Sequence, residues 1–215
     1  MFDEVLTNFL TRDFWPDFLF VNEYPALAVI WNIFLATIPL AIYYLLVKIS
    51  QKDINFTKKA TVRLLFLVWL LFLPNSAYII TEIRHLSGLY DNINVYNREV
   101  VGVWSIVFFF LYALVGYGLF VYSVQRMVKL LKDSFFVCSW LVLPVIMFTC
   151  SLGVLVGLVG RWNSWELFLQ PRVVFLEVAK YFLFWEYFKN LIICFVLYYI
   201  MYYGGIFMTQ RIKHE

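Results

Sequence analysis

The feature that most constrains this chain is a series of long stretches without any charged side chain. Four of them have at least 20 residues and cover 26–47, 100–124, 134–160 and 190–209. A helix needs about 20 mostly apolar residues to cross the hydrocarbon core of a bilayer. A fifth stretch, 64–80, has 17 residues and lies at the lower end of that range. Runs this long are typical of transmembrane helices and not of barrel strands, in which apolar and polar residues alternate.

The composition agrees with a bilayer as the solvent of this chain. Its residues are 63% hydrophobic and 14% charged, which leaves too little polar surface for a water-soluble domain of 215 residues. We therefore predict an all-α fold with a single integral membrane domain over residues 1–215. It is a polytopic bundle of about five transmembrane helices with short external helical elements. Cys138, Cys150 and Cys194 fall inside predicted spans, where they act as small apolar residues and predict no disulfide framework.

Lysine and arginine are distributed unevenly between the two sides that five spans define. One side carries 48–63, 125–133 and the C-terminal tail, which together hold ten Lys or Arg and three Asp or Glu. The rest of the chain holds seven Lys or Arg and eleven Asp or Glu. Because short cytoplasmic loops are enriched in Lys and Arg, we predict an external N-terminus and a cytoplasmic C-terminus in a plasma membrane. The net charge of +3 is then a topology signal, and we expect the lipid bilayer as a partner and no nucleic acid.

This orientation can be tested with single cysteines in a background whose native cysteines are replaced by alanine. Cysteines introduced at Asn92 and Gln170 should react with a membrane-impermeant thiol reagent in intact cells. A cysteine at Asn55 should react only after the cells are made permeable. Labelling at Asn55 alone in intact cells would reverse the predicted orientation.

The first polar motif, LPNSAYIITEIRHL (73–86), lies at the end of the second predicted span and contains Pro74, which is expected to break the helix before Asn75. If the helix resumes there, four polar side chains share an arc of about 80°. They are Asn75, Tyr78, Glu82 and His85. Thr81 lies beside this stripe, and Arg84 is predicted to point away from it, toward headgroups.

Two interpretations of the stripe stay open. In the first, Glu82 and His85 form an acid–base pair or bind a ligand, because histidine titrates near neutral pH. In the second, the stripe braces the helix: Asn75 repairs the proline break, and Glu82 pairs with Arg84, Arg161 or another cation.

The second polar motif, RWNSWELFLQP, follows the fourth span. One interpretation is structural, with Asn163 as helix N-cap, Glu166 at the third helical position of a capping box, and Trp162 in the membrane–water belt. The other is that Arg161 and Arg172 hold an anion such as a lipid phosphate or a carboxylate. Both motifs emerge on the outer side of the predicted topology, so we expect Glu82 or His85 to lie near Arg161 or Asn163.

Smaller features concern packing and the segment before the last span. Gly153 and Gly157 form a small-xxx-small pattern, which we interpret as packing within this chain. Gly116 and Gly118 should permit close packing of the third span. The segment 173–189 has opposite charges three residues apart on nearly opposite helix faces, and we predict a partly external helix that leads into the last span.

The two polar motifs, together with WNIFLATIPL in the first span, resemble a bacterial membrane-protein family catalogued as domain of unknown function 1361. The resemblance covers most of the chain. It implies a multi-spanning protein of the bacterial plasma membrane and implies no activity. Members of that family tend to carry aspartate where this chain has Glu82 and Glu166, so the carboxylate here reaches one methylene further.

We therefore expect a membrane protein with an outward-facing polar pocket for a small ligand, a peptide or a lipid headgroup. An enzyme that acts on a lipid or lipid-linked substrate, with Glu82 and His85 as the acid–base pair, is the alternative. A transporter subunit is a second alternative. We expect no cofactor and no metal site, and the sequence leaves the oligomeric state open. The candidate ligand-binding residues are Asn75, Tyr78, Glu82, His85, Arg161, Trp162, Asn163 and Glu166.

Overall fold

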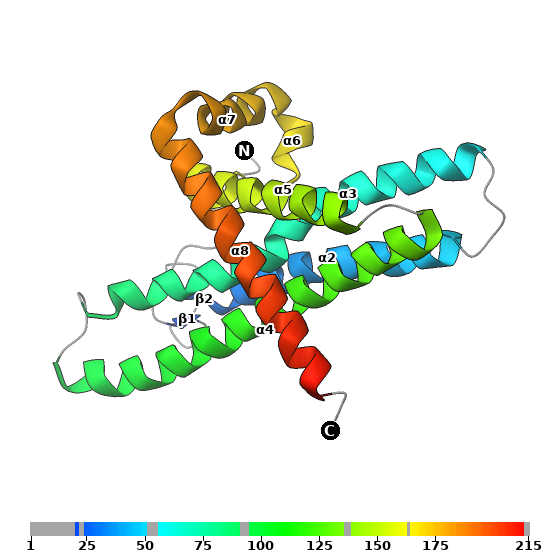
Figure 1. Ribbon diagram of the computed structural model, residues 1–215. Helices are drawn as coiled ribbons and strands as arrows, with labels where there is room; N and C mark the ends of the chain where they lie inside the picture. Colours follow the sequence, from blue (N-terminus) through cyan, green and yellow to red (C-terminus); the bar gives the residue numbers. More distant parts are fainter. Residues whose placement is uncertain are drawn as a thin grey trace.

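The computed structural model describes residues 20–21, 24–50, 56–90, 95–135, 139–162 and 164–212. Its elements in chain order are β1 (Phe20–Val21), β2 (Tyr24–Pro25), α2 (Ala26–Ser50), α3 (Phe56–Thr81), the 3₁₀ helix η3 (Glu82–Tyr90), α4 (Val95–Phe135), α5 (Ser139–Gly160), α6 (Glu166–Leu169), α7 (Pro171–Leu183) and α8 (Trp185–Ile212). The two-residue strands β1 and β2 pair antiparallel. The predicted all-α helix bundle is confirmed (Figure 1).

Among the described residues, five helical segments are long and apolar enough to cross a membrane. They are Ala26–Ser50, Ala60–Leu86, Val103–Asp133, Trp140–Gly160 and Trp185–Gln210. The five predicted spans overlap these segments one by one. The number and order of the spans therefore follow from the uncharged stretches of the sequence.

Several predicted boundaries are wrong, because charged residues do not end a helix. The segment 125–133, predicted as a loop, is the continuation of α4 to Phe135. Its cations Arg126, Lys129 and Lys132 recur every third residue and share one side of the helix, while Met127 is buried. Likewise, α3 begins within the predicted loop 48–63.

The segment 173–189 contains a helix break that the sequence analysis did not predict. Helix α7 ends at Leu183, Phe184 is extended (φ −112°, ψ 124°), and α8 begins at Trp185. The last helix is therefore longer at its start than the predicted span 190–209.

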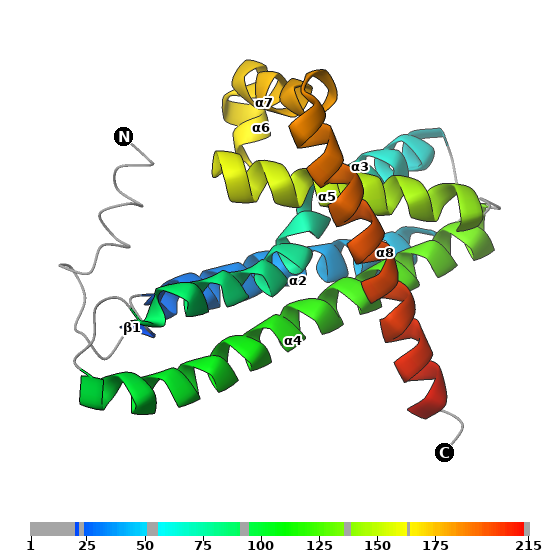
Figure 2. The same ribbon diagram turned by 60° about the vertical axis from the view of Figure 1, so that its left-hand side comes forward.

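Helix α3 lies at the centre of the bundle, in contact with α2, α4 and α5. Both views show α8 crossing the other long helices obliquely, with α6 and α7 beside α5 (Figures 1 and 2). The main core around α3 contains Trp69 and Leu73, which are fully buried, together with Phe120 of α4 and Ile146 of α5.

Side-chain hydrogen bonds connect the helices across this core. Ser76 Oγ of α3 donates to the carbonyl of Ala36 in α2 at 2.9 Å, and Trp69 Nε1 donates to Ser123 Oγ in α4 at 3.1 Å. Such bonds between helices contribute roughly 0.6 kcal/mol each in membrane proteins. They fix the rotation of α3, and so they decide which of its faces meets α5.

Two glycines let α3 approach its neighbours closely. A Cβ on Gly153 of α5 would lie 2.4 Å from Cγ of Pro74, and a Cβ on Gly116 of α4 would lie 2.6 Å from Cβ of Ile79. The prediction that Gly153 serves packing within the chain is confirmed. The prediction for Gly118 is wrong, because a Cβ there would meet nothing within 4 Å.

Candidate functional site

The site is built around Pro74, which lies inside α3. Proline has no N–H to donate to the carbonyl four residues earlier, and its ring crowds the preceding turn. Two other carbonyls of that turn accept side-chain hydrogen bonds: Asn75 Nδ2 donates to the carbonyl of Phe72 at 3.0 Å, and Ser164 Oγ donates to the carbonyl of Leu71 at 3.1 Å. Asn75 thus binds the turn before Pro74, and the helix continues through the predicted break.

The two polar motifs are in direct contact beside Pro74. Asn75 Nδ2 also donates to Ser164 Oγ at 3.1 Å, across 89 residues of sequence. Sequence reasoning missed Ser164, because a single serine in a turn carries no pattern. Serine is common in the turn before a helix, so its presence there predicts no contact with another helix. Only the fold shows that Ser164 lies against α3.

The motifs line a common pocket of about 410 Å³, which lies within the size range of small-molecule sites. Its polar lining consists of Asn32, Asn75, Tyr78, Glu82, Arg84, His85, Arg161, Trp162 and Ser164. Its remaining wall consists of Leu35, Pro74, Gly153, Val154, Gly157 and Leu158. The residues thus come from α2, from α3 and η3, and from α5 and the segment after it.

Glu82 lies at the inner side of this pocket and is 1% exposed. Its carboxylate oxygens lie 3.2 Å from His85 Nε2 and 3.6 Å from Arg84 Nη2. The imidazole of His85 stacks on the ring of Phe109 in α4, with 5.9 Å between centroids. A buried carboxylate needs such cationic or hydrogen-bonding neighbours. The stacking on Phe109 holds the His85 ring in place beside Glu82.

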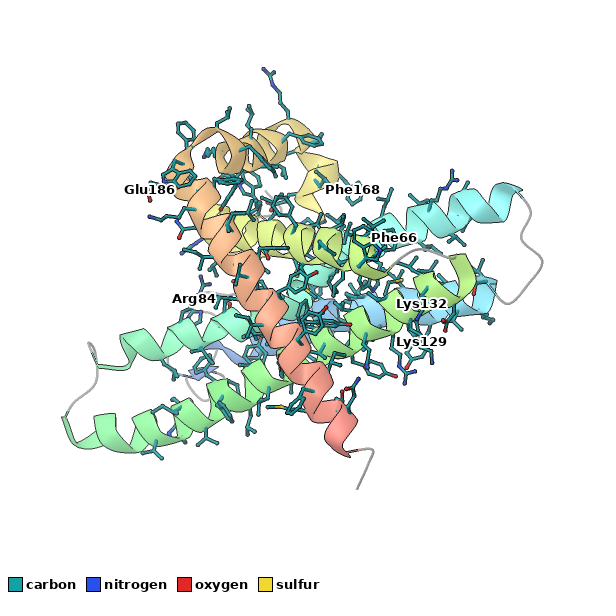
Figure 3. The ribbon with its side chains drawn as sticks, viewed as in Figure 1. Phe66, Arg84, Lys129, Lys132, Phe168 and Glu186 are labelled. Carbon is teal, nitrogen blue, oxygen red and sulfur yellow. The ribbon has the colours of Figure 1, made fainter. Side chains whose placement is uncertain are left out.

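The prediction that Arg84 points away from the stripe is wrong. Arg84 Nη2 donates to the hydroxyl of Tyr78 at 3.0 Å, and its guanidinium lies 5.8 Å from the Tyr78 ring centroid. Figure 3 shows Arg84, which is part of η3, on the other side of the molecule from Lys129 and Lys132 of α4. The long arginine side chain turns back from its Cα toward the pocket.

Arg161 is held in an unusual backbone conformation. It follows the last residue of α5 with φ 56°, and it is the only non-glycine residue with a positive φ among those that the structure describes. Helices commonly place glycine at this left-handed position, and an L side chain there costs about 1 kcal/mol or more. The conformation directs the chain after α5 so that Arg161 and Trp162 both line the pocket.

The predicted capping box is wrong. Glu166 is the first residue of α6, with Trp165 at the N-cap position, and no side chain caps this end among the described residues. Glu166 is 7% exposed and does not line the pocket. Asn163 lies outside the described residues. Pro171 is the first residue of α7. Trp165 packs its ring on Trp31 of α2, with 6.3 Å between centroids.

Six of the eight candidate ligand-binding residues therefore line one pocket: Asn75, Tyr78, Glu82, His85, Arg161 and Trp162. Sequence reasoning did not include Asn32, Arg84 and Ser164 among the candidate ligand-binding residues, although all three line the pocket. Within the described ranges, no three His, Cys, Asp or Glu side chains come together in a group that could hold a metal ion.

Within the part of the chain that the structure describes, five helices are long and apolar enough to cross a membrane and a polar site lies between them, which indicates a multi-pass integral membrane protein. The chain belongs to the family described as "Protein of unknown function (DUF1361)", whose match covers residues 31–203 and includes both polar motifs. The family resemblance found in the sequence is thereby confirmed. No curated protein and no solved structure matches the chain.

Proposed function

We propose that this protein binds, in the pocket between its two polar motifs, a small ligand that carries an anionic group. The observation that carries the proposal is the charge of the lining. Its permanent charges are the cations Arg84 and Arg161 and the carboxylate of Glu82, which already lies against Arg84 and His85. Arginine binds phosphate and carboxylate groups by paired, charge-assisted hydrogen bonds.

The backbone of Arg161 supports a binding role for this side chain. A left-handed residue at a helix end is most stable as glycine, and backbone strain of this kind tends to occur at functional sites. The phosphate headgroup of an anionic lipid and a free organic phosphate share the chemistry that this pocket recognises. The predicted outward orientation puts the pocket on the external side of a bacterial plasma membrane.

The Arg161→Gln and Arg172→Gln variants test this proposal as a matched pair. Arg172, which the sequence analysis paired with Arg161 as an anion-binding residue, is exposed at the start of α7 and does not line the pocket. Binding of phosphatidylglycerol and of glycerol 3-phosphate is measured by native mass spectrometry and thermal shift in detergent. Arg161→Gln should weaken binding at least about tenfold, the effect of losing one charged hydrogen bond. Arg172→Gln should leave binding unchanged.

Binding of phosphatidylglycerol without binding of glycerol 3-phosphate would indicate a lipid ligand, and the reverse would indicate a free phosphate. Equal losses in both variants, or no binding of either probe to the unmodified protein, would contradict the proposal. An Arg161→Gly variant is a further control. It should gain about 1 kcal/mol of stability through its backbone and still lose the ligand.

An enzyme with an acid–base pair is the second candidate, and one distance favours it. His85 Nε2 lies 3.2 Å from Glu82 Oε2, within reach of the proton transfers that general acid–base catalysis requires. The same mass spectra separate the candidates, because a binding protein returns the probe with its mass unchanged and an enzyme does not.

A further inference from the structure

Helix α7 buries a charged side chain and exposes large apolar ones, which is the reverse of the pattern of a surface helix in water. The side that faces the protein contains Val174, Glu177 and Tyr181, which are buried or nearly so. The opposite side contains four large apolar side chains that are 54–76% exposed. They are Phe175, Leu176, Phe182 and Leu183.

The carboxylate of α7 is turned toward the protein. Glu177 Oε2 lies 2.6 Å from Lys180 Nζ, and the Glu177 side chain is 13% exposed, while that of Lys180 is 44% exposed. Its Cγ lies 3.3 Å from the position of a Cβ on Gly160, at the end of α5. Polar groups that face the protein and apolar groups that face outward are the arrangement expected where the surroundings are lipid.

The contacts of α7 place it along the side of α5, and not beyond its end. Glu177 is level with Gly160, Tyr181 belongs to the same buried cluster as Leu155 and Val156, and the ring of Phe182 lies 6.2 Å from that of Phe148. Phe148 precedes Gly160 by 12 residues, about 18 Å along a helix axis. Both views show α7 beside α5 (Figures 1 and 2).

We propose that α7 is embedded in the same half of the bilayer as the C-terminal half of α5, with its outward side covered by lipid acyl chains. Helix α5 is one of the segments able to cross a membrane, so a side chain level with Phe148 lies inside the hydrocarbon core. The exposed apolar surface also continues from α7 through Phe184 and Trp185 into α8.

The charges at the two ends of α7 fit this placement. Arg172 stands in its first turn, and Glu186 pairs with Lys189 at 3.0 Å just after its end. Figure 3 shows Glu186 at the corner between α7 and α8. Long charged side chains at the ends of an embedded helix reach back to the headgroups. Between Arg172 and Glu186, the charges of this described segment are the Glu177–Lys180 pair.

Spin labels in reconstituted vesicles of phosphatidylcholine and phosphatidylglycerol test the embedding. Single cysteines at Leu176 and Leu183 report on α7, in a background without native cysteines. Val145, which is 55% exposed on α5, is the lipid-facing control, and Gln170 is the water-facing control. Labels at Leu176 and Leu183 should collide with oxygen several times more often than with a water-soluble nickel chelate, as at Val145.

Two outcomes would overturn this placement. Collision with the nickel chelate as frequent as at Gln170 would put α7 in water, and low collision with both reagents would put another protein surface on it. The unmodified protein gives an independent measurement. A membrane-soluble carbene reagent should insert into 173–184 as it does into α5, and insertion into α5 without insertion into α7 would contradict the proposal. Neither measurement depends on ligand binding in the pocket.

Discussion

Replacing Arg84 with glutamine should lower the free energy of unfolding by about 2 kcal/mol. Glu82 is almost fully buried, and Arg84 Nη2 lies 3.6 Å from Oε1 of its carboxylate. Removal of one partner of a buried ion pair leaves a charge that costs about 3–5 kcal/mol when nothing else compensates it. His85 remains beside Glu82, so a smaller loss is expected.

The double variant Arg84→Gln with Glu82→Gln sharpens this prediction. In the double variant, Glu82→Gln should restore most of the lost stability, because it removes the buried charge. The single Glu82→Gln variant should lose little, because the Arg84 side chain is already 45% exposed and can turn to water. Unfolding in mixed micelles measures all three variants. Lys189→Gln, in the exposed pair Glu186–Lys189, is the control and should change nothing measurable. If the double variant is as unstable as Arg84→Gln, the buried charge is not the cause.

Replacing Gly153 with alanine should lower the stability by about 1–3 kcal/mol, the usual range for an overpacked core. The new Cβ would lie 2.4 Å from Cγ and 2.9 Å from Cβ of Pro74, and the proline ring cannot turn aside. Helix α5 must therefore move away from α3. Pro74 and Gly153 both line the pocket, so ligand binding should weaken in parallel.

Gly118→Ala is the matched control for this substitution. A Cβ there meets nothing within 4 Å, and alanine favours a helix over glycine by about 0.5–1 kcal/mol. The two variants should therefore change the thermal unfolding midpoint in opposite directions. An increase in both would show that α3 and α5 are less closely packed than described.

The polar stripe could be predicted from the sequence although the helix type changes within it. Asn75 and Tyr78 lie on α3, whereas Glu82 and His85 lie on the 3₁₀ helix η3. Residues three apart are eclipsed in a 3₁₀ helix, so His85 stays on the side of Glu82. The position of Arg84 could not be predicted, because helical periodicity gives the direction of the Cα–Cβ bond and not the end of a long side chain.

The ends of the helices were the least predictable part of the fold. Charged residues after an apolar run can belong to a loop or to the same helix beyond the membrane, and in 125–133 they belong to α4. The α6 region depended on contacts distant in sequence, such as Ser164 with Leu71. Neither local propensity nor periodicity contains that information.

The bond from Ser164 to Leu71 also has a consequence for biogenesis. The hydroxyl that occupies a carbonyl of α3 belongs to a residue 93 positions later, and a ribosome needs about 5–20 s to make that much chain. Throughout this interval α3 lacks the hydrogen bond from Ser164, and Asn75 lacks its partner in the second polar motif. Membrane insertion of α3 therefore precedes its final stabilisation, and a nascent chain that stalls before Ser164 lacks the contact that joins the two polar motifs.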